Sequence, residues 1–216
     1  MRSELASQRV WRMGGVGMAA WLALPVKRCR RLAPEGVDPA LIPLASRVPG
    51  ILVAARYDST STLSYSELGL GILARPSGGR LGFYCAALWV DNAESCEAGR
   101  DLWGLPKAMA RFDWQTSGSG WSVRVETEEA GVATLSTDAP RSGLGVPFST
   151  NWFSFPHDRL ARWTIRSRSV LNQARIGIEI PGGSPLSDIG IGRTCRGLFL
   201  DPLHLAIRVP RAAGGA

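Results

Sequence analysis

Short extended segments that alternate with turn-forming residues constrain the fold of this chain more than any other feature. Residues 51–57, 63–75 and 81–90 are rich in apolar side chains. The residues between them include Asp58-Ser59-Thr60 and Pro76-Ser77-Gly78-Gly79, which are typical of turns. This spacing predicts consecutive antiparallel strands, because strands joined by short turns pair in that direction.

The same pattern continues through the second half of the 216-residue chain. Breaks at residues 117–120, at 181–183 and at Pro202 separate strands that we expect at residues 110–114, 121–126, 132–136, 163–169, 174–180 and 203–209. The apolar run 14–26 is interpreted as an entry segment and first strand. No repeat or internal linker divides the chain, so we predict one mainly β (α+β) domain over residues 1–216, with a disordered tail at 212–216.

Two short helices are expected between these strands. A basic helix begins near Lys27 and closes at Pro34-Glu35-Gly36, because proline cannot continue a helix and glycine releases the backbone. A second begins at Asp91-Asn92-Ala93-Glu94, which has the spacing of a capping box with Asp91 as the N-cap. This helix runs to about Trp103, where a glycine and a proline end it. Lys107 therefore follows directly on a helix.

Composition narrows the class of protein. Apolar residues make up 45% of the chain and eight residues are tryptophan, which predicts a packed core. The four cysteines form no Cys-x-x-Cys pair and no histidine lies at zinc-ligand spacing, so we expect reduced thiols, no metal and a cytoplasmic location. Arg9 and Arg12 precede the first apolar run as in a signal peptide. Glu4, the lack of a clear cleavage site and the shortness of the run argue against a signal or a membrane span.

The net charge of +7 keeps a third, weaker hypothesis open, namely a protein that binds nucleic acid or an anionic membrane through arginine. The arginines are spread from Arg2 to Arg211 and surround no recognisable nucleic-acid module. Solvated faces are the more economical explanation of this charge. We therefore expect neither nucleic acid nor a membrane as a partner.

Lys107 is the first candidate for chemistry, since only two of the 25 basic residues are lysines. A lysine can lose its proton and attack a carbonyl carbon, which an arginine in practice cannot do. A free amine has a pKa near 10.4, so a nucleophilic lysine needs surroundings that disfavour the ammonium form, and burial provides them. The neighbours Trp103, Leu105, Pro106 and Met109 are apolar. Residue patterns alone nevertheless favour an exposed lysine at a helix end, where a cation suits the helix dipole.

Glu67 is the second candidate. Strand alternation places Tyr65, Glu67, Gly69 and Gly71 on one face of their segment, so the carboxylate shares its face with a tyrosine and with glycines that leave space. That arrangement is typical of a pocket wall. A solvated face of an edge strand is an equally good interpretation of the pattern.

No cofactor is expected. The sequence Gly69-x-Gly71-x-x-Ala74 imitates a dinucleotide-binding fingerprint, but the Pro-Ser-Gly-Gly turn that follows forbids the helix that the fingerprint requires. The histidines are His157 and His204, and no Gly-x-Ser-x-Gly elbow exists, so a serine hydrolase has little support.

The sequence Gly99-Arg100-Asp101-Leu102-Trp103-Gly104-Leu105-Pro106-Lys107 resembles the G-R-[ED]-x-x-G-x-P-K signature of the acetoacetate decarboxylase family. Tyr65-Ser66-Glu67 is similar to that family's second element, Y-x-E, and the segment 31–37 is similar to its L-L-P-x-G-L segment. The resemblance covers residues 21–112 well, and the second half fits as generic strands.

This resemblance implies a cone-like, closed β-barrel that assembles as a homo-oligomer, and a Schiff-base mechanism without a cofactor. Lys107 would be the catalytic amine, Glu67 would orient the substrate or shuttle a proton, and Tyr65, Trp103 and Arg12 would bind the substrate. The substrate would be a small β-keto acid or ketone, and the simplest reaction is decarboxylation. Ala108 stands where well-studied family members have a second lysine, so here burial would have to activate the amine.

Two other functions remain open on the sequence. An iminium and enamine also serve aldol, dehydration and cyclisation chemistry. A pocket lined by glycine and tryptophan also suits a larger apolar ligand, such as a polyketide or carotenoid-like molecule, without catalysis.

Overall fold

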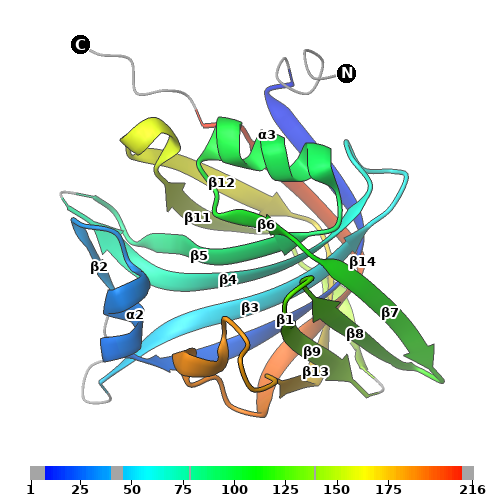
Figure 1. Ribbon diagram of the computed structural model, residues 1–216. Helices are drawn as coiled ribbons and strands as arrows, with labels where there is room; N and C mark the ends of the chain where they lie inside the picture. Colours follow the sequence, from blue (N-terminus) through cyan, green and yellow to red (C-terminus); the bar gives the residue numbers. More distant parts are fainter. Residues whose placement is uncertain (1–7, 40–45, 78, 139, 211–216) are drawn as a thin grey trace.

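Seven strands close into a barrel in this computed structural model, which describes residues 8–39, 46–77, 79–138 and 140–210 (Figure 1). In order around the barrel they are β1 (Val10–Pro25), β3 (Arg47–Tyr57), β4 (Tyr65–Pro76), β5 (Gly82–Val90), β11 (Phe148–Ser154), β12 (Ala161–Ser167) and β14 (Thr194–Arg208). Antiparallel pairing of β14 with β1, from Val10 opposite Arg208, closes the ring. The expected mainly β, closed-barrel fold is therefore confirmed.

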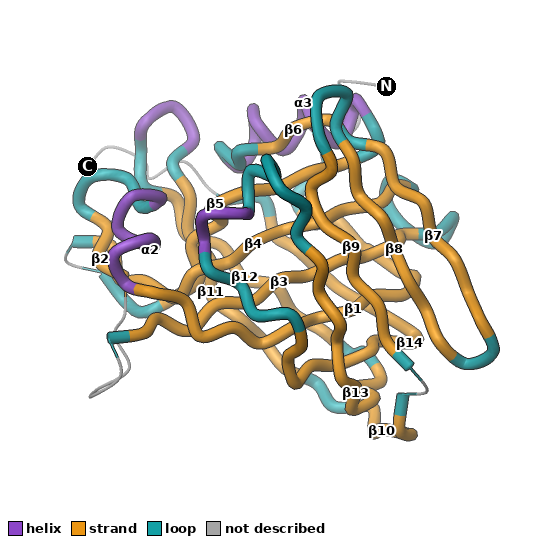
Figure 2. The backbone as a smooth tube through the Cα atoms, turned by 60° about the horizontal axis from the view of Figure 1, so that its bottom comes forward, coloured by secondary structure: helices purple, strands orange, loops and turns teal. Residues whose placement is uncertain are grey.

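A second group of strands extends from the barrel (Figure 2). It runs outward from β14 through β13 (Val170–Glu179), β9 (Gly131–Thr137), β8 (Gly120–Glu126) and β7 (Arg111–Ser117). Three short strands pair at other places: β2 (Val37–Pro39) with β4, β6 (Lys107–Met109) with β5, and β10 (Arg141–Gly145) with β13. The described α-helices are α2 (Val26–Leu32) and α3 (Ala93–Trp103), and single 3-10 turns lie at Pro156–Asp158 and Ser187–Ile189.

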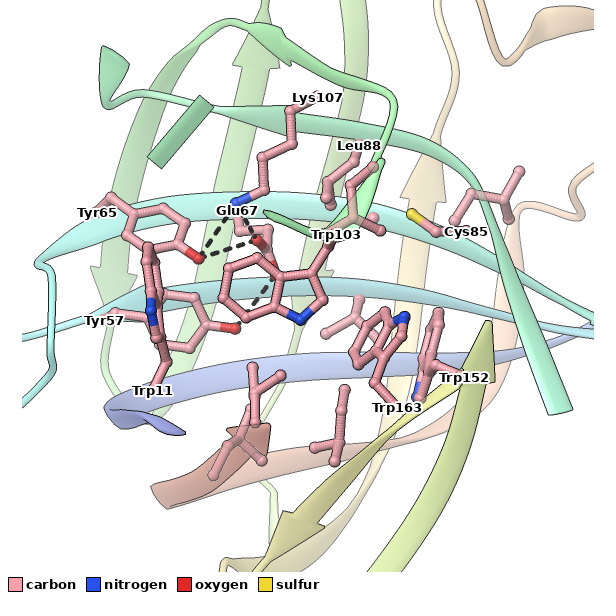
Figure 3. A pocket seen from close by; sticks show the side chains of 17 residues that line it. Trp11, Tyr57, Tyr65, Glu67, Cys85, Leu88, Trp103, Lys107, Trp152 and Trp163 are labelled. Carbon is pink, nitrogen blue, oxygen red and sulfur yellow. Dashed lines mark hydrogen bonds and ion pairs between the residues drawn. The ribbon is translucent and has the colours of Figure 1, made fainter. Parts of the chain in front are cut away.

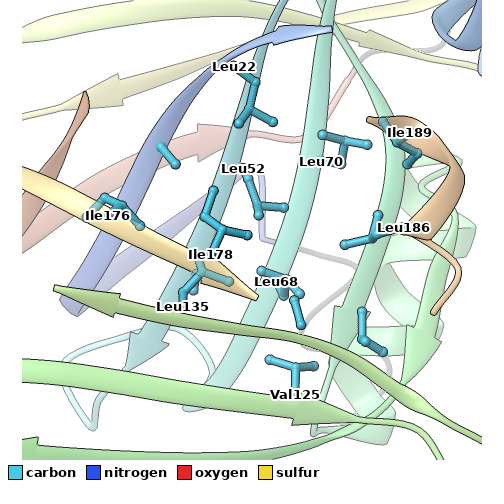
Figure 4. Packing of buried hydrophobic residues seen from close by; sticks show 14 of the residues in the cluster. Leu22, Leu52, Leu68, Leu70, Val125, Leu135, Ile176, Ile178, Leu186 and Ile189 are labelled. Atoms are coloured by element: carbon cyan, nitrogen blue, oxygen red, sulfur yellow. The ribbon is translucent and has the colours of Figure 1, made fainter. Parts of the chain in front are cut away.

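The alternation of side chains along the strands gives the described part of the chain two large cores. Even-numbered positions of β4, such as Leu68 and Leu70, pack outside the barrel against the second group of strands (Figure 4). Leu52 and Leu68 are fully buried there, and burial of each such side chain contributes about 1.5–3 kcal/mol to the stability of the fold. Odd-numbered positions of β4, beginning with Tyr65, face the barrel interior. This second core holds the candidate site.

Most predicted elements are confirmed, with boundaries that differ by a few residues. The N-cap of α3 is Asn92 instead of the predicted Asp91, because the Asn92 side chain accepts from Ser95 N at 2.9 Å. Asp91 instead accepts a hydrogen bond from Ser66 N on β4 at 2.6 Å. The strands β2, β6, β10 and β11 were not expected from the sequence.

The predicted break at Pro202 is also wrong, since β14 continues through this residue. The pairing of β14 with β1 shifts register here, from Leu200 opposite Gly17 to Leu203 opposite Gly15. A bulge of this kind tolerates the missing N–H of proline inside a sheet. The tail at 212–216 lies outside the described residues, and the single-domain assignment stays a prediction. In the part of the chain that the structure describes, no helix is long and apolar enough to cross a membrane.

Candidate active site

A cavity of about 120 Å³ lies inside the barrel, and every one of the seven barrel strands contributes to its wall (Figure 3). The end of α3, the following loop and β6 complete the lining. Most of the wall is apolar, and four indole rings contribute to it: Trp11, Trp103, Trp152 and Trp163. Lys107 and Glu67 are the charged residues among the described lining residues.

The connection from α3 to β6 places Lys107 in this cavity. Gly104 ends the helix in the left-handed conformation with φ of 61°, and a Cβ at this position would meet the backbone of Pro156. The chain then turns and β6 pairs in parallel with β5, so that Lys107 lies opposite Leu88. The glycine and the short strand together direct the lysine into the barrel.

Gly99 and Arg100, both on α3, help to position Lys107. A Cβ on Gly99 would lie 2.5 Å from Lys107 Cδ and 2.6 Å from Cε, so the lysine stem passes where a side chain would otherwise be. Arg100 Nε donates to the Lys107 carbonyl oxygen at 2.8 Å and fixes the backbone. The glycine and arginine of the sequence Gly99-to-Lys107 therefore have direct physical roles at the lysine.

The Lys107 amine is buried, with 5% of the residue exposed, and has three polar partners. Nζ donates to Ser95 Oγ at 2.8 Å and to Tyr65 Oη at 3.5 Å, and it lies 3.4 Å from Glu67 Oε2. It also lies 4.9 Å from the centroid of the Tyr65 ring. The interpretation of Lys107 as an exposed lysine at a helix end is therefore wrong.

Glu67 connects the amine to two tyrosines. Tyr57 Oη donates to Glu67 Oε1 at 3.3 Å, and Tyr65 Oη donates to Oε2 at 3.1 Å. Burial, and after it the charge of Glu67, raise the pKa of both phenols well above the usual 10.0. Both hydroxyls therefore stay protonated and continue to donate to the carboxylate at neutral and moderately alkaline pH. Because β4 lies between β3 and β5, the edge-strand interpretation of Glu67 is also wrong.

Two of the tryptophans have indole N–H groups without a partner among the described residues. Nε1 of Trp11 and Nε1 of Trp103 are both buried, and neither makes a hydrogen bond. The rings meet edge to face, with centroids 5.0 Å apart. Leaving a buried donor unpaired costs about 1–3 kcal/mol. Trp152 and Trp163, in the same wall, donate to Thr150 Oγ1 and Ser154 Oγ.

The structure brings together four of the five residues proposed for the site: Lys107, Glu67, Tyr65 and Trp103. Arg12 is not among them. It is exposed on the outside of the barrel, in a surface depression shared with Arg166 and Arg208. Trp11, its neighbour in β1, faces the cavity instead.

Sequence reasoning missed two residues that contact this network, Ser95 and Tyr57. Tyr57 lies opposite Tyr65 in the β3–β4 pairing, and the alternation of residues 51–57 was a usable signal for it. Ser95 has no comparable signal, since its link to Lys107 depends on how the chain returns after α3.

The chain is therefore a closed β-barrel protein whose internal cavity holds a buried lysine–glutamate pair. The family model for acetoacetate decarboxylase (ADC) matches residues 27–156, which is more than half of the chain. The chain belongs to the acetoacetate decarboxylase family. Proteins of this family are enzymes. No protein with a curated description matches the chain by sequence.

Solved structures share the fold at low sequence identity. Acetoacetate decarboxylase from Legionella pneumophila subsp. pneumophila str. Philadelphia 1 is 12% identical, with a TM-score of 0.70 over 94% of this chain and 86% of that one. An acetoacetate decarboxylase-like enzyme from Sphingomonas wittichii RW1 is 14% identical, with a TM-score of 0.66 over 95% of this chain and 93% of that one. The enduracididine biosynthesis enzyme MppR, complexed with pyruvate, is 16% identical, with a TM-score of 0.65 over 94% of this chain and 89% of that one.

Proposed function

We propose that Lys107 is the nucleophilic amine of a cofactor-independent Schiff-base enzyme that acts on a small carbonyl compound. The observation that carries this proposal is the position of the amine, buried beside an internal cavity and 3.4 Å from a carboxylate oxygen of Glu67. A carboxylate at that distance can exchange a proton with the amine.

The first half of the reaction follows from these groups. The Lys107 ammonium passes a proton to Glu67, and the neutral amine attacks the carbonyl carbon to give a carbinolamine. Protonated Glu67 returns the proton to the carbinolamine hydroxyl, water leaves, and a protonated imine forms. The two tyrosines that donate to Glu67 keep its oxygens in position through these transfers.

Two outcomes are open to this iminium. With a β-keto acid, the electrons of the bond to the carboxylate flow into the iminium, carbon dioxide leaves, and protonation at carbon and hydrolysis release a ketone and the free amine. Alternatively, loss of a proton next to the iminium gives the same type of enamine, which attacks a second carbonyl. The family name supports decarboxylation. MppR, solved with a condensation product of pyruvate and imidazole 4-carboxaldehyde, supports carbon–carbon condensation.

The size of the cavity supports a small substrate over a carotenoid-like ligand. The cavity measures about 120 Å³. An apolar protein cavity of about 150 Å³ accommodates benzene. A substrate of about that size fits this interior, whereas a long polyketide or carotenoid does not fit without rearrangement of the wall.

Borohydride trapping tests the proposal. After incubation with acetoacetate and sodium borohydride, we expect a reduced adduct on the peptide that contains Lys107. Lys27→Arg should keep the adduct and Lys107→Arg should abolish it, while both variants remain folded by circular dichroism. A Lys107 peptide that stays unmodified in the folded wild type, with acetoacetate and also with a neutral ketone, would contradict the proposal. Release of carbon dioxide, measured in parallel without borohydride, separates decarboxylation from condensation.

A further inference from the structure

The pocket around Lys107 is electrically balanced before any substrate enters. Lys107 and Glu67 form an ion pair, and the remaining described lining residues are aromatic, aliphatic, a glycine and a thiol. No arginine is among them. A substrate carboxylate would therefore be a second anion in a buried site whose cation already faces a carboxylate, and burying such a charge without a partner is costly.

The pKa values of three ionisable side chains in the wall show that their uncharged forms are favoured. Burial first, and the charge of Glu67 second, raise the pKa of the Cys85 thiol to about 12. The same two causes raise the pKa of Tyr57 and of Tyr65. These side chains come from three different strands of the wall, and burial favours the neutral form of each one.

The unpaired donors indicate what the pocket is suited to hold. Trp11 and Trp103 are 3% and 4% exposed, and their indole N–H groups have no acceptor in the described part of the chain. In Figure 3 the Trp103 ring projects into the middle of the pocket, next to Glu67 and Lys107. An indole N–H is a neutral donor, which satisfies a carbonyl, ester or hydroxyl oxygen but does not neutralise a carboxylate.

We propose that the substrate of Lys107 is a small uncharged ketone or aldehyde with a second oxygen, such as a β-hydroxy ketone, and that Trp103 and Trp11 donate to that oxygen. The inference rests on the proposed function of Lys107 and specifies its substrate class. It favours carbon–carbon bond formation, cleavage or dehydration of neutral carbonyl compounds over decarboxylation of a β-keto acid anion.

The test uses two probes of nearly equal shape and different charge, methyl acetoacetate and acetoacetate. Wild-type protein at pH 7.5 is incubated with each probe over a range of concentrations, reduced with borohydride, and the Lys107 peptide is quantified by mass spectrometry. Adducts of acetoacetate and of its product acetone are counted together. Trapping on Nα-acetyl-lysine corrects for the intrinsic reactivity of each probe. The ester should reach half-saturation at a concentration at least about tenfold lower than the acid, the ratio that corresponds to 1.4 kcal/mol of discrimination.

Tryptophan variants test the donors. Trp103→Phe and Trp11→Phe should each raise the half-saturating concentration of the ester by about 2- to 12-fold, the range expected for one hydrogen bond. Pentan-2-one lacks the second oxygen, so neither substitution should change its half-saturating concentration. Trp21→Phe is the matched control, because Trp21 is 50% exposed and outside the pocket.

Each result has one meaning. If acetoacetate reaches half-saturation in the wild type at the same concentration as methyl acetoacetate or at a lower one, the inference is overturned and the proposed function still stands. If the half-saturating concentration of the ester is unchanged in both tryptophan variants, the assignment of the donors is overturned. No adduct with any probe overturns the proposed function, and the substrate assignment with it.

Discussion

Substitution of Gly99 by alanine gives the sharpest test of how Lys107 is positioned. The new Cβ would lie 2.5 Å from Lys107 Cδ, and ordinary contact begins at 3.4 Å, so the lysine stem must move by about 0.9 Å. The helix itself should tolerate the change, since alanine is favoured over glycine inside helices by about 0.5–1 kcal/mol. The displacement therefore falls on the flexible lysine and not on the fold.

A misplacement of about 1 Å in a catalytic group costs about 100-fold in rate. We expect Gly99→Ala to slow borohydride trapping at saturating probe by about this factor, with a thermal midpoint close to that of the wild type. Gly192→Ala is the matched control, because a Cβ there meets nothing within 4 Å. Trapping at the wild-type rate in a folded Gly99→Ala variant would refute the argument that this glycine makes room for the amine.

Three further predictions follow from the surroundings of the amine. Burial raises the pKa of Cys85 to about 12, so alkylation of its thiol by iodoacetamide in the native protein should be negligible at pH 8 and accelerate up to pH 12; rapid labelling at pH 8, read by peptide mass spectrometry, would contradict this. The raised pKa of Tyr57 keeps it protonated in the native state above pH 10.0 while the unfolded chain ionises, so stability is lost as pH rises. Between pH 10 and 11 the ionisation of this phenol in the unfolded chain accounts for about 1 kcal/mol of that loss, so Tyr57→Phe should reduce the loss measured in urea titrations by about 1 kcal/mol, and an unchanged loss would contradict the reasoning. Ser95→Ala removes the 2.8 Å bond from a buried ammonium and should lower the free energy of unfolding by about 1.5–3 kcal/mol, a prediction that a change below about 0.5 kcal/mol would exclude.

Strand alternation allowed much of the fold to be predicted, and it failed where pairing depends on distant segments. The β4 segment was assigned correctly because its apolar positions face one core. The strand β11 was missed because its sequence, FSTNWFS, alternates weakly, and the two residue pairs that join it to β5 lie almost 70 positions apart in sequence. Asp91 and Asn92 are both good caps, and they differ only in their contacts in the folded chain, where Asn92 accepts from Ser95 N and Asp91 accepts from Ser66 N on β4.

The site was predictable to the extent that each residue's face could be inferred. Tyr65 and Glu67 share a face by simple alternation, and the structure confirms that they face the cavity. The same rule predicts that Arg12 faces outward, since its apolar neighbours Trp11 and Met13 occupy the inward positions of β1. Ser95 could not be predicted, because hydrogen bonds between a helix and a later strand leave no local pattern.

The groups whose burial is hardest to justify on stability grounds all face one cavity. A buried ion pair such as that of Lys107 and Glu67 is weak support for a fold, and apolar residues of similar volume are often at least as stabilising. The unpaired donors of Trp11 and Trp103 also cost stability, whereas the indoles of Trp152 and Trp163 are satisfied. Local departures from stable packing are expected where a protein acts on a ligand. Because both departures meet in the barrel interior, the reactive amine and the neutral donors are best understood as two parts of one substrate site.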